Sequence, residues 1–302
     1  MISDVELGVT LYDWPNFGPD AEPLLRFVKQ ADEFGFKYLH LLDHVVGIVA
    51  DKHGGIANTP YTDKSNIHEC FTLIAYLAAI TDQITFVTGI LGLPQRQTAL
   101  VAKQAAEIDI LSGGRINLGL GVGYNDLEFA AMGADFKTRG KRFEEQVEVL
   151  RLLWTENDAS FSGRFHEFKD VSLAPRPLQR PIPLLFGMGR TAQPIAPDPI
   201  LKRAGRLADG WYPLFAPDHP EAGRAVATVA EGAREAGRNP DELILVMNLD
   251  IDNPTDPAVL DAIRRRRDFG ANRVSLNLHG QSADQQLTYL SQLQDLLASA
   301  SD

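Results

Sequence analysis

The chain has 302 residues, 44% of them hydrophobic, a single cysteine and a formal net charge of −11 at pH 7. The acidic balance disfavours nucleic-acid binding, and one cysteine excludes an internal disulfide and fits a reducing compartment. No apolar run reaches the roughly 18 residues of a membrane helix, and the N-terminus lacks a signal-peptide pattern. We therefore expect a cytoplasmic protein without nucleic-acid or membrane partners.

Strand-like and helix-like segments alternate through the first half of the chain. The continuous apolar run Tyr38–Leu42 predicts a strand covered on both faces, whereas apolar residues at helical spacing predict the helices. We expect strands at Val5–Tyr12, Tyr38–Leu42, Ile84–Leu91 and Ile116–Val122, and helices at Glu22–Phe36, Phe71–Ile80, Thr98–Leu111 and Phe143–Trp154.

The second half continues the alternation and completes eight strand–helix units. Strands are expected at Pro183–Phe186, Gly210–Pro213, Leu243–Leu249 and Arg273–Leu278, and helices at Pro199–Leu207, Pro220–Ala236, Pro257–Phe269 and Ala283–Ala298. Such alternation implies a parallel sheet, and its length favours a closed barrel of about 250 residues plus an insertion over two ordinary domains. The prediction is α/β, a single (β/α)8 TIM-barrel domain over residues 1–302, with an insertion after helix 4 at about 155–182.

Two connections are longer than the fold requires. Val46–Ile67 follows the second strand, and Thr155–Ile182 contains a predicted β-hairpin around Ser162-Gly163. Long loops in a compact domain commonly form lids or binding loops.

The second strand ends in Asp43-His44, which places two polar side chains at the rim of the barrel. A histidine there can hold or transfer a proton near neutral pH. The alternative is that Asp43 caps loop amides and His44 is a rim residue whose hydrogen bonds are satisfied within the protein.

The fourth strand ends in a run of alternate glycines, Gly119-Leu120-Gly121-Val122-Gly123, followed by Tyr124. The spacing is not that of a dinucleotide fingerprint, and the run is on the fourth strand rather than the first. Alternate glycines bare one face of a strand, which predicts a flat floor for a planar ring; the alternative is tight packing inside the barrel.

Glycines also mark the ends of the third and fifth strands, at Gly89-Ile90 and at Gly187-Met188-Gly189-Arg190-Thr191. Backbone amides, a hydroxyl and an arginine ahead of a helix predict a phosphate site in the second segment, with an ordinary glycine-rich turn as the alternative. The histidines lack metal-ligand spacing, and no nucleophile motif occurs, so an organic cofactor is expected to supply the reactivity.

These motifs together resemble the bacterial luciferase-like superfamily of flavin- and deazaflavin-dependent oxidoreductases. The resemblance covers essentially the whole chain and includes Leu41-Leu42-Asp43-His44, Thr88-Gly89-Ile90-Leu91, Ser112-Gly113-Gly114-Arg115 and Ala208-Asp209-Gly210-Trp211. It implies a ring in the barrel mouth that is supported by a non-prolyl cis peptide at Gly89-Ile90.

The resemblance is greatest to the branch that uses deazaflavin coenzyme F420, because light-emitting members carry a phosphate-binding arginine where this chain has Val122. It implies hydride transfer between F420 and a small organic substrate. His44 and Tyr124 are then the catalytic candidates, and the cofactor-binding candidates are Asp43, Gly89, Ile90, Val122, Gly123, Gly187, Gly189, Arg190 and Thr191. Arg96 and Lys202 are candidates for holding the acidic tail of the cofactor.

Two alternatives stay open: an FMN-dependent monooxygenase supplied by a separate reductase, and a non-catalytic flavin-binding barrel. Sugar-phosphate dehydrogenases of the deazaflavin branch carry a glutamate where this chain has Tyr124, which argues against a sugar-phosphate substrate. The family resemblance also implies a homodimer.

Overall fold

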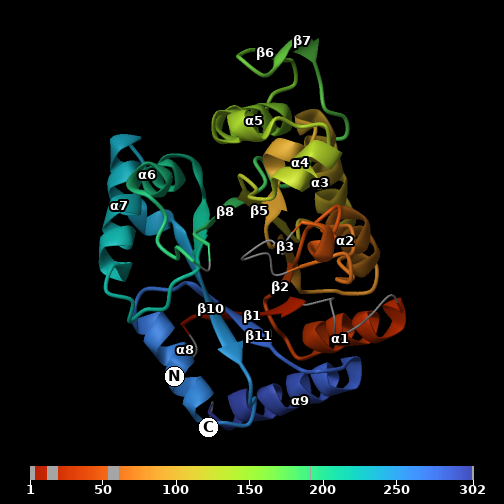
Figure 1. The fold of residues 1–302 in the computed structure, drawn as a ribbon, viewed down its shortest axis with the longest axis vertical. Helices are drawn as coiled ribbons and strands as arrows, with labels where there is room; N and C mark the ends of the chain where they lie inside the picture. The colour runs from red at the N-terminus through yellow and green to blue at the C-terminus, as the bar shows by residue number, and fades with distance from the viewer. Residues whose placement is uncertain (1–3, 12–19, 54–60, 191, 301–302) are drawn as a thin grey trace.

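The structure is a computed structural model that describes residues 4–11, 20–53, 61–190 and 192–300. Within these ranges, eight parallel strands close into a barrel (Figure 1). They are β1 (Glu6–Leu11), β2 (Tyr38–Leu41), β3 (Thr85–Thr88), β5 (Ile116–Gly121), β8 (Leu184–Met188), β9 (Gly210–Pro213), β10 (Ile244–Ile251) and β11 (Arg273–Leu278). Pairing runs β3-β2-β1-β11-β10-β9-β8-β5, and β3 pairs with β5 to close the ring, which confirms the predicted α/β barrel.

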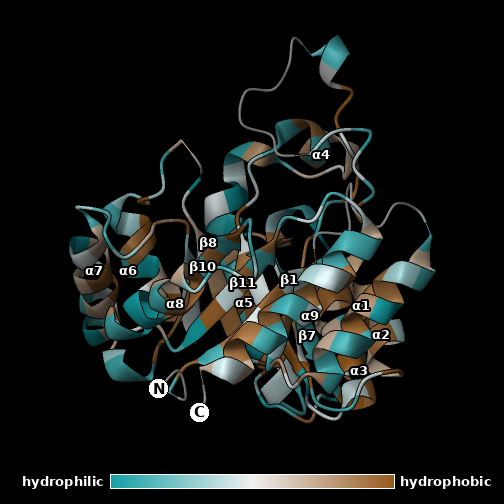
Figure 2. Cartoon of the chain, turned by 90° about the horizontal axis from the view of Figure 1, so that it is seen from below, coloured by the Kyte–Doolittle hydropathy of each residue, from teal (hydrophilic) through white to brown (hydrophobic). Residues whose placement is uncertain are grey.

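Helices occupy the connections between the strands and surround the barrel. They are α1 (Ala21–Glu33), α2 (Cys70–Ala78), α3 (Thr98–Ser112), α4 (Asp126–Ala131), α5 (Arg139–Thr155), α6 (Asp198–Leu207), α7 (Ala222–Glu235), α8 (Ala258–Asp268) and α9 (Ala283–Ser299), with short 3-10 turns η1 (Ala50–Lys52), η2 (Leu93–Gln95), η3 (Phe136–Thr138) and η4 (Pro240–Glu242). Figure 2 shows hydrophobic residues on the strands and on the inward helix faces. No helix in the described ranges is long and apolar enough to cross a membrane.

The predicted segments are recovered, with small shifts at their ends that have local causes. All four residues of β2 are buried, as the continuous apolar run predicted. The first helix ends at Glu33 rather than Phe36, because Gly35 adopts a left-handed backbone with φ +82° that glycine enters without a Cβ clash. The short helix α4 is an element that the sequence pattern did not predict.

The third strand departs from the prediction, because Ile84–Leu91 is not one continuous strand. β3 stops at Thr88, the peptide Gly89-Ile90 is cis, and the two-residue strand β4 (Leu91–Gly92) resumes pairing with β5. The cis peptide lies where the family resemblance placed it. The interruption turns Ile90 toward the inside of the barrel mouth, where it lines a cavity.

The insertion after α5 contains the predicted hairpin, formed by β6 (Ala159–Ser162) and β7 (Glu167–Val171). In Figure 1 it lies beyond α5, away from the strands. Glu145 of α5 accepts the backbone N–H groups of Arg164 and Phe165 and contacts Nδ1 of His166 at 2.8 Å. A carboxylate on α5 therefore anchors the turn of the hairpin.

Candidate active site

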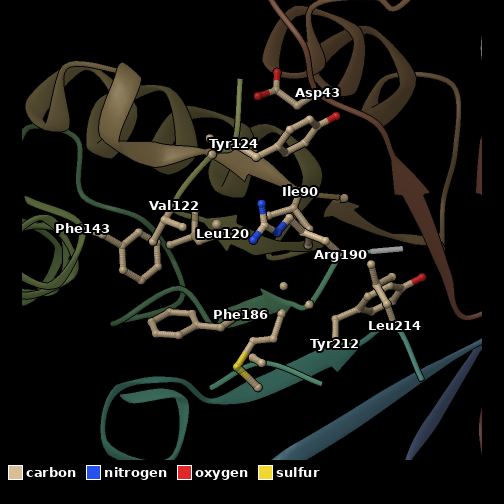
Figure 3. Close-up of a pocket in the computed structure, with 18 of the residues that line it drawn as sticks. Asp43, Ile90, Leu120, Val122, Tyr124, Phe143, Phe186, Arg190, Tyr212 and Leu214 are labelled. Atoms are coloured by element: carbon tan, nitrogen blue, oxygen red, sulfur yellow. The ribbon is translucent and has the colours of Figure 1, made fainter. Parts of the chain in front are cut away.

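A cavity of about 510 Å3 opens among the C-terminal ends of the strands, where barrel enzymes place their active sites. Its volume lies in the range of small-molecule pockets, about 300–1,000 Å3. It is lined by ten of the eleven residues that were predicted as catalytic or cofactor-binding: Asp43, His44, Gly89, Ile90, Val122, Gly123, Tyr124, Gly187, Gly189 and Arg190. Figure 3 shows several of them. The eleventh, Thr191, lies outside the described residues.

His44 is held by a carboxylate that the sequence analysis missed. Glu128 of α4 is buried; its Oε1 accepts the backbone N–H of Val45 at 2.6 Å, and its Oε2 lies 3.2 Å from Nδ1 of His44. The ring of His44 stacks on Tyr61 at a centroid distance of 3.5 Å and meets Tyr124 edge-on at 6.0 Å. Because the carboxylate only accepts hydrogen bonds, Nδ1 of His44 is the donor, and Nε2 of the neutral ring has the lone pair that can accept a proton.

The charge of Glu128 fits this role. Burial alone would raise the pKa of Glu128, but hydrogen bonds from His44 and the Val45 backbone outweigh it and hold the pKa below its ordinary value. Burial, followed by the nearby charge of Glu128, raises the pKa of Tyr124, so Tyr124 stays a neutral phenol at physiological pH. Of the side chains in this cluster, His44 is thus the one whose second ring nitrogen can accept a proton from a ligand.

Asp43, which lines the cavity, forms a second charged pair with Arg96, which does not. Its Oδ1 accepts a hydrogen bond from Arg96 at 2.7 Å, and Arg96 also lies 3.6 Å from Glu69. Burial raises the pKa of Asp43, an effect that the Arg96 guanidinium opposes. Arg96 does not line the cavity, so the structure places it as the partner of Asp43 rather than at a ligand's tail.

The glycine strand provides space for Ile90. A Cβ at Gly121 would lie 3.0 Å from Cγ2 of Ile90, and one at Gly187 would lie 2.6 Å from its Cγ1. A Cβ at Gly119 would lie 1.8 Å from the carbonyl oxygen of Thr88. Gly119 therefore serves close strand packing, and the predicted flat floor is instead an isoleucine side chain fitted between glycines of neighbouring strands.

Three arginines also line the cavity: Arg139, Arg190 and Arg203. Arg203 is paired with Glu144 at 3.6 Å, which leaves Arg139 and Arg190. Burial lowers the pKa of Arg139, and the positive charge of Arg190 lowers it further, so the two guanidinium groups repel each other. Neither forms an ion pair with any residue in the described part of the chain, and Nε of Arg139 is buried without a partner. Figure 3 shows Arg190 reaching into the centre of the cavity.

Lys202, the other candidate for the acidic tail, does not line the cavity. Its ammonium group is held at 2.7 Å by both Glu231 and Glu235, on α6 and α7 outside the barrel. The arginines of the cavity wall are the cations that face the ligand space instead.

Several residues of the site gave little signal in the sequence. Glu128 lies three residues after Asn125, which caps α4 by accepting the N–H groups of Leu127 and Glu128; the spacing is that of a capping box, although the carboxylate turns to His44. His40 is one polar residue in an apolar strand, and a polar side chain buried on both faces is itself a signal. Tyr61 lies in the long loop, where no periodicity points to it.

The sequence profile of luciferase-like monooxygenases matches residues 7–285 of the chain. A Mycobacterium tuberculosis protein, Rv0940c, is 36% identical over 217 residues, which cover 72% of this chain and 70% of that protein. The FMNH2-dependent dimethylsulfone monooxygenase of Pseudomonas putida is 39% identical over 152 residues, 49% of this chain and 39% of that protein.

Among solved structures, the coenzyme F420-dependent tetrahydromethanopterin reductase of Methanopyrus kandleri superposes with a TM-score of 0.75 over 98% of this chain and 99% of that one, at 18% identity. This likeness concerns the fold. The profile match and the mycobacterial relative concern the sequence itself.

Proposed function

The chain belongs to the luciferase-like monooxygenase family of oxidoreductases, and from that premise we propose that it transfers a hydride between coenzyme F420 and a small organic substrate. The observation that carries the proposal is the pairing, across one cavity, of a carboxylate-held histidine with arginines that have no carboxylate partner. The first suits proton transfer to a substrate, and the second suits a cofactor with an acidic tail.

The residues of the cavity fit such a cofactor. Uncompensated arginines bind phosphate and carboxylate groups through paired N–H donors, and the buried Nε of Arg139 has no acceptor within the described part of the protein. Arg139, Arg190 and the backbone from Gly187 to Gly189 would hold the tail, and Ile90 would support the ring. When bound, the deazaflavin ring supplies a two-electron hydride donor or acceptor at C5.

His44 would act as the general base and general acid of the reaction. When a substrate alcohol is oxidised, Nε2 of His44 accepts the hydroxyl proton while the adjacent C–H bond breaks, its hydride leaves and the carbonyl forms. Glu128 stabilises the resulting imidazolium through Nδ1, at 3.2 Å. In the opposite direction the imidazolium returns the proton to the oxygen, so the same pair serves oxidation and reduction.

The second candidate is an FMN-dependent monooxygenase that receives reduced flavin from a separate reductase. It is favoured by the 39% identity to a monooxygenase of that kind over half of this chain. F420 is preferred because FMN carries one phosphate, whereas the cavity offers two arginines without a carboxylate partner in the described part of the chain, Arg139 and Arg190. Val122, which lines the cavity, leaves no cation at the position that the family resemblance assigns to the flavin phosphate.

Titration of the apoprotein with each cofactor separates the candidates. We expect F420 to quench the protein fluorescence at micromolar concentrations and FMN to bind more weakly. Tight FMN binding with no F420 binding would overturn the preference. Binding of a cofactor without turnover of any alcohol, enone or nitroaromatic substrate would favour a non-catalytic binding protein.

We also propose a homodimer that buries the outer faces of α2 and α3. Tyr76 of α2 and Leu100 and Leu111 of α3 are large hydrophobic side chains that are 58%, 52% and 60% exposed, and the two helices are neighbours in the barrel wall. Light scattering should give twice the chain mass, and Leu111→Glu should shift it toward the monomer. A monomeric wild-type protein would refute the proposal.

A further inference from the structure

The inner end of the cavity is polar, unlike the wall around Ile90. Thr10, His40, Tyr212 and Asn248 line it from β1, β2, β9 and β10. His40 is only 2% exposed, and none of these residues has a role in the chemistry of His44. The question is which hydrogen-bonding group His40 presents to a ligand.

A hydrogen-bonded chain leads from the rim of the barrel to His40. Asn277 donates its Nδ2 hydrogen to Asp250 at 2.9 Å, and Thr10 bonds Oδ1 of Asn277 at 2.5 Å. Oγ of Ser275 lies 3.0 Å from Oγ1 of Thr10 and 2.8 Å from Nδ1 of His40. The chain therefore ends at Nδ1 of His40.

The direction of every hydrogen in this chain follows from its first member. A carboxylate only accepts, so Asp250 fixes the amide of Asn277 with its nitrogen outward and its oxygen toward Thr10. Thr10 must then donate its single hydrogen to Asn277, which leaves Ser275 to donate its own hydrogen to Thr10. With that hydrogen spent, Ser275 can only accept from His40, and Nδ1 of His40 carries the proton.

The neighbours of Ser275 agree with this assignment. The buried hydroxyl of Tyr38 has no hydrogen-bond partner among the described residues, so it does not compete with Thr10 for the hydrogen of Ser275. Ser275 then makes one donated contact, to Thr10, and one accepted contact, from His40. The assignment gives one hydrogen to each contact in the chain.

The imidazole of His40 is neutral and has one nitrogen left over. Burial, and then the positive charge of Arg273, lower the pKa of His40 to about 3. A neutral imidazole with a proton on Nδ1 has a lone pair on Nε2. Cδ2, the atom next to Nε2, would lie 3.5 Å from a Cβ at Gly89. His40 and Gly89 both line the cavity, and no described residue bonds Nε2.

We propose that the inner end of the cavity is a subsite that selects a hydrogen-bond donor, an O–H or N–H of the bound ligand, through the Nε2 lone pair of His40. The proposal rests on the proposed function only in taking this cavity as the ligand site. The donor can belong to the ring system of the cofactor or to the substrate. In either case a ligand that presents a carbonyl or ether oxygen to His40 is rejected, because two acceptors face each other.

Two variants distinguish the effect of the Nε2 lone pair of His40 from the effect of its hydrogen bond to Ser275. In His40→Asn the amide nitrogen replaces Nδ1 and still donates to Ser275, but nothing occupies the position of Nε2. In His40→Gln the amide reaches the position of Nε2 and can present an oxygen there. We expect the His40→Asn variant to lose the preference for hydrogen-bond donors and the His40→Gln variant to recover part of it. Thermal melting of both variants shows whether the barrel stays folded.

Binding measurements test the selection and identify the source of the donor. Phenol and anisole share a ring and differ in the hydroxyl group; the apoprotein should bind phenol at least about fivefold more tightly, and His40→Asn should abolish the difference. F420 and FMN titrations of the same variant show whether the cofactor supplies the donor, through a loss of similar size, or the substrate does, through unchanged cofactor affinity. Equal binding of phenol and anisole to wild type would overturn the proposal.

The tautomer has a separate readout that needs neither ligand nor turnover. A long-range 15N–1H correlation spectrum, assigned with His40→Asn, should show a protonated Nδ1 and an unprotonated Nε2 throughout the range from about pH 5 to 8 in which ordinary histidines titrate. Ser275→Ala removes the acceptor and should release the tautomer. A protonated Nε2 in wild type would refute the proposal, whereas failure of both cofactors to bind would refute only the proposed function.

Discussion

Replacement of Glu128 by glutamine tests how the site controls its histidine. The carboxylate accepts from the backbone N–H of Val45 at 2.6 Å and from His44 at 3.2 Å, and Tyr61 lies at 3.4 Å. A glutamine side chain has the same shape but one acceptor oxygen. The shorter Val45 contact takes that oxygen, so the amide nitrogen must face Nδ1 of His44.

The consequence is a reversed tautomer. With an N–H donor opposite Nδ1, neutral His44 carries its proton on Nε2 and cannot accept one from a substrate. General acid–base catalysis by a positioned side chain contributes about 10²–10⁴-fold, and we expect Glu128→Gln to lower kcat by a factor in that range. Loss of hydrogen bonds to a charged group should lower the free energy of unfolding by about 1–3 kcal/mol.

Single-turnover absorbance of the deazaflavin measures the hydride step, and thermal melting measures stability. Glu145→Gln is the matched control, because Glu145 also accepts from a histidine, His166 at 2.8 Å, but outside the cavity. The control should lose stability and keep kcat. A Glu128→Gln enzyme with kcat within about threefold of wild type would show that Glu128 does not set the proton position of His44.

Three further predictions concern the cavity and the insertion. Gly187→Ala should destabilise the protein by about 1–3 kcal/mol, since its Cβ would lie 2.6 Å from Ile90; adding Ile90→Ala should restore most of the loss in calorimetry, and additive effects would argue against the contact. Arg139→Met and Arg190→Met should each weaken F420 binding by about 10-fold or more and flatten its salt dependence in fluorescence titrations; unchanged affinity would place the acidic tail elsewhere. Burial would raise the pKa of Glu145, but hydrogen bonds from His166 and nearby backbone N–H groups outweigh burial and hold the pKa below its ordinary 4.5. The stabilisation that Glu145→Gln removes should therefore be largest above pH 4.5 and fade as the pH falls below it. A difference in melting temperature between wild type and variant that grows in acid would contradict this sign.

The order of elements was predictable because parallel strands that are buried on both faces have mostly apolar sequences. Tyr38–Leu41 and Ile116–Gly121 are such strands, each apolar except for one buried polar residue, His40 and Asn117 respectively. The break between Thr88 and Leu91 could not come from periodicity, since Ile90 is as apolar as its strand neighbours. Only the family resemblance indicated the cis peptide there.

The site was predictable at strand ends and less so elsewhere. Asp43, His44 and Arg190 directly follow strands, so topology alone brings them to one rim. Glu128 and Arg139 stand on helical segments beyond the rim, and their direction depends on how α4 and α5 pack. The role of His40 could not be predicted, because a single polar residue in a buried strand gives no indication of function until its hydrogen-bond partners on distant strands are known.

Because Ile90 fits between Gly121 and Gly187, we expect these three positions to covary in evolution. A chain that gains a side chain at either glycine must lose volume at position 90, because the two atoms would otherwise occupy the same space. Sequences descended from a common ancestor should thus change these positions together or not at all. Efforts to widen the cavity for larger substrates can use this rule, since a smaller residue at position 90 frees both glycines to vary.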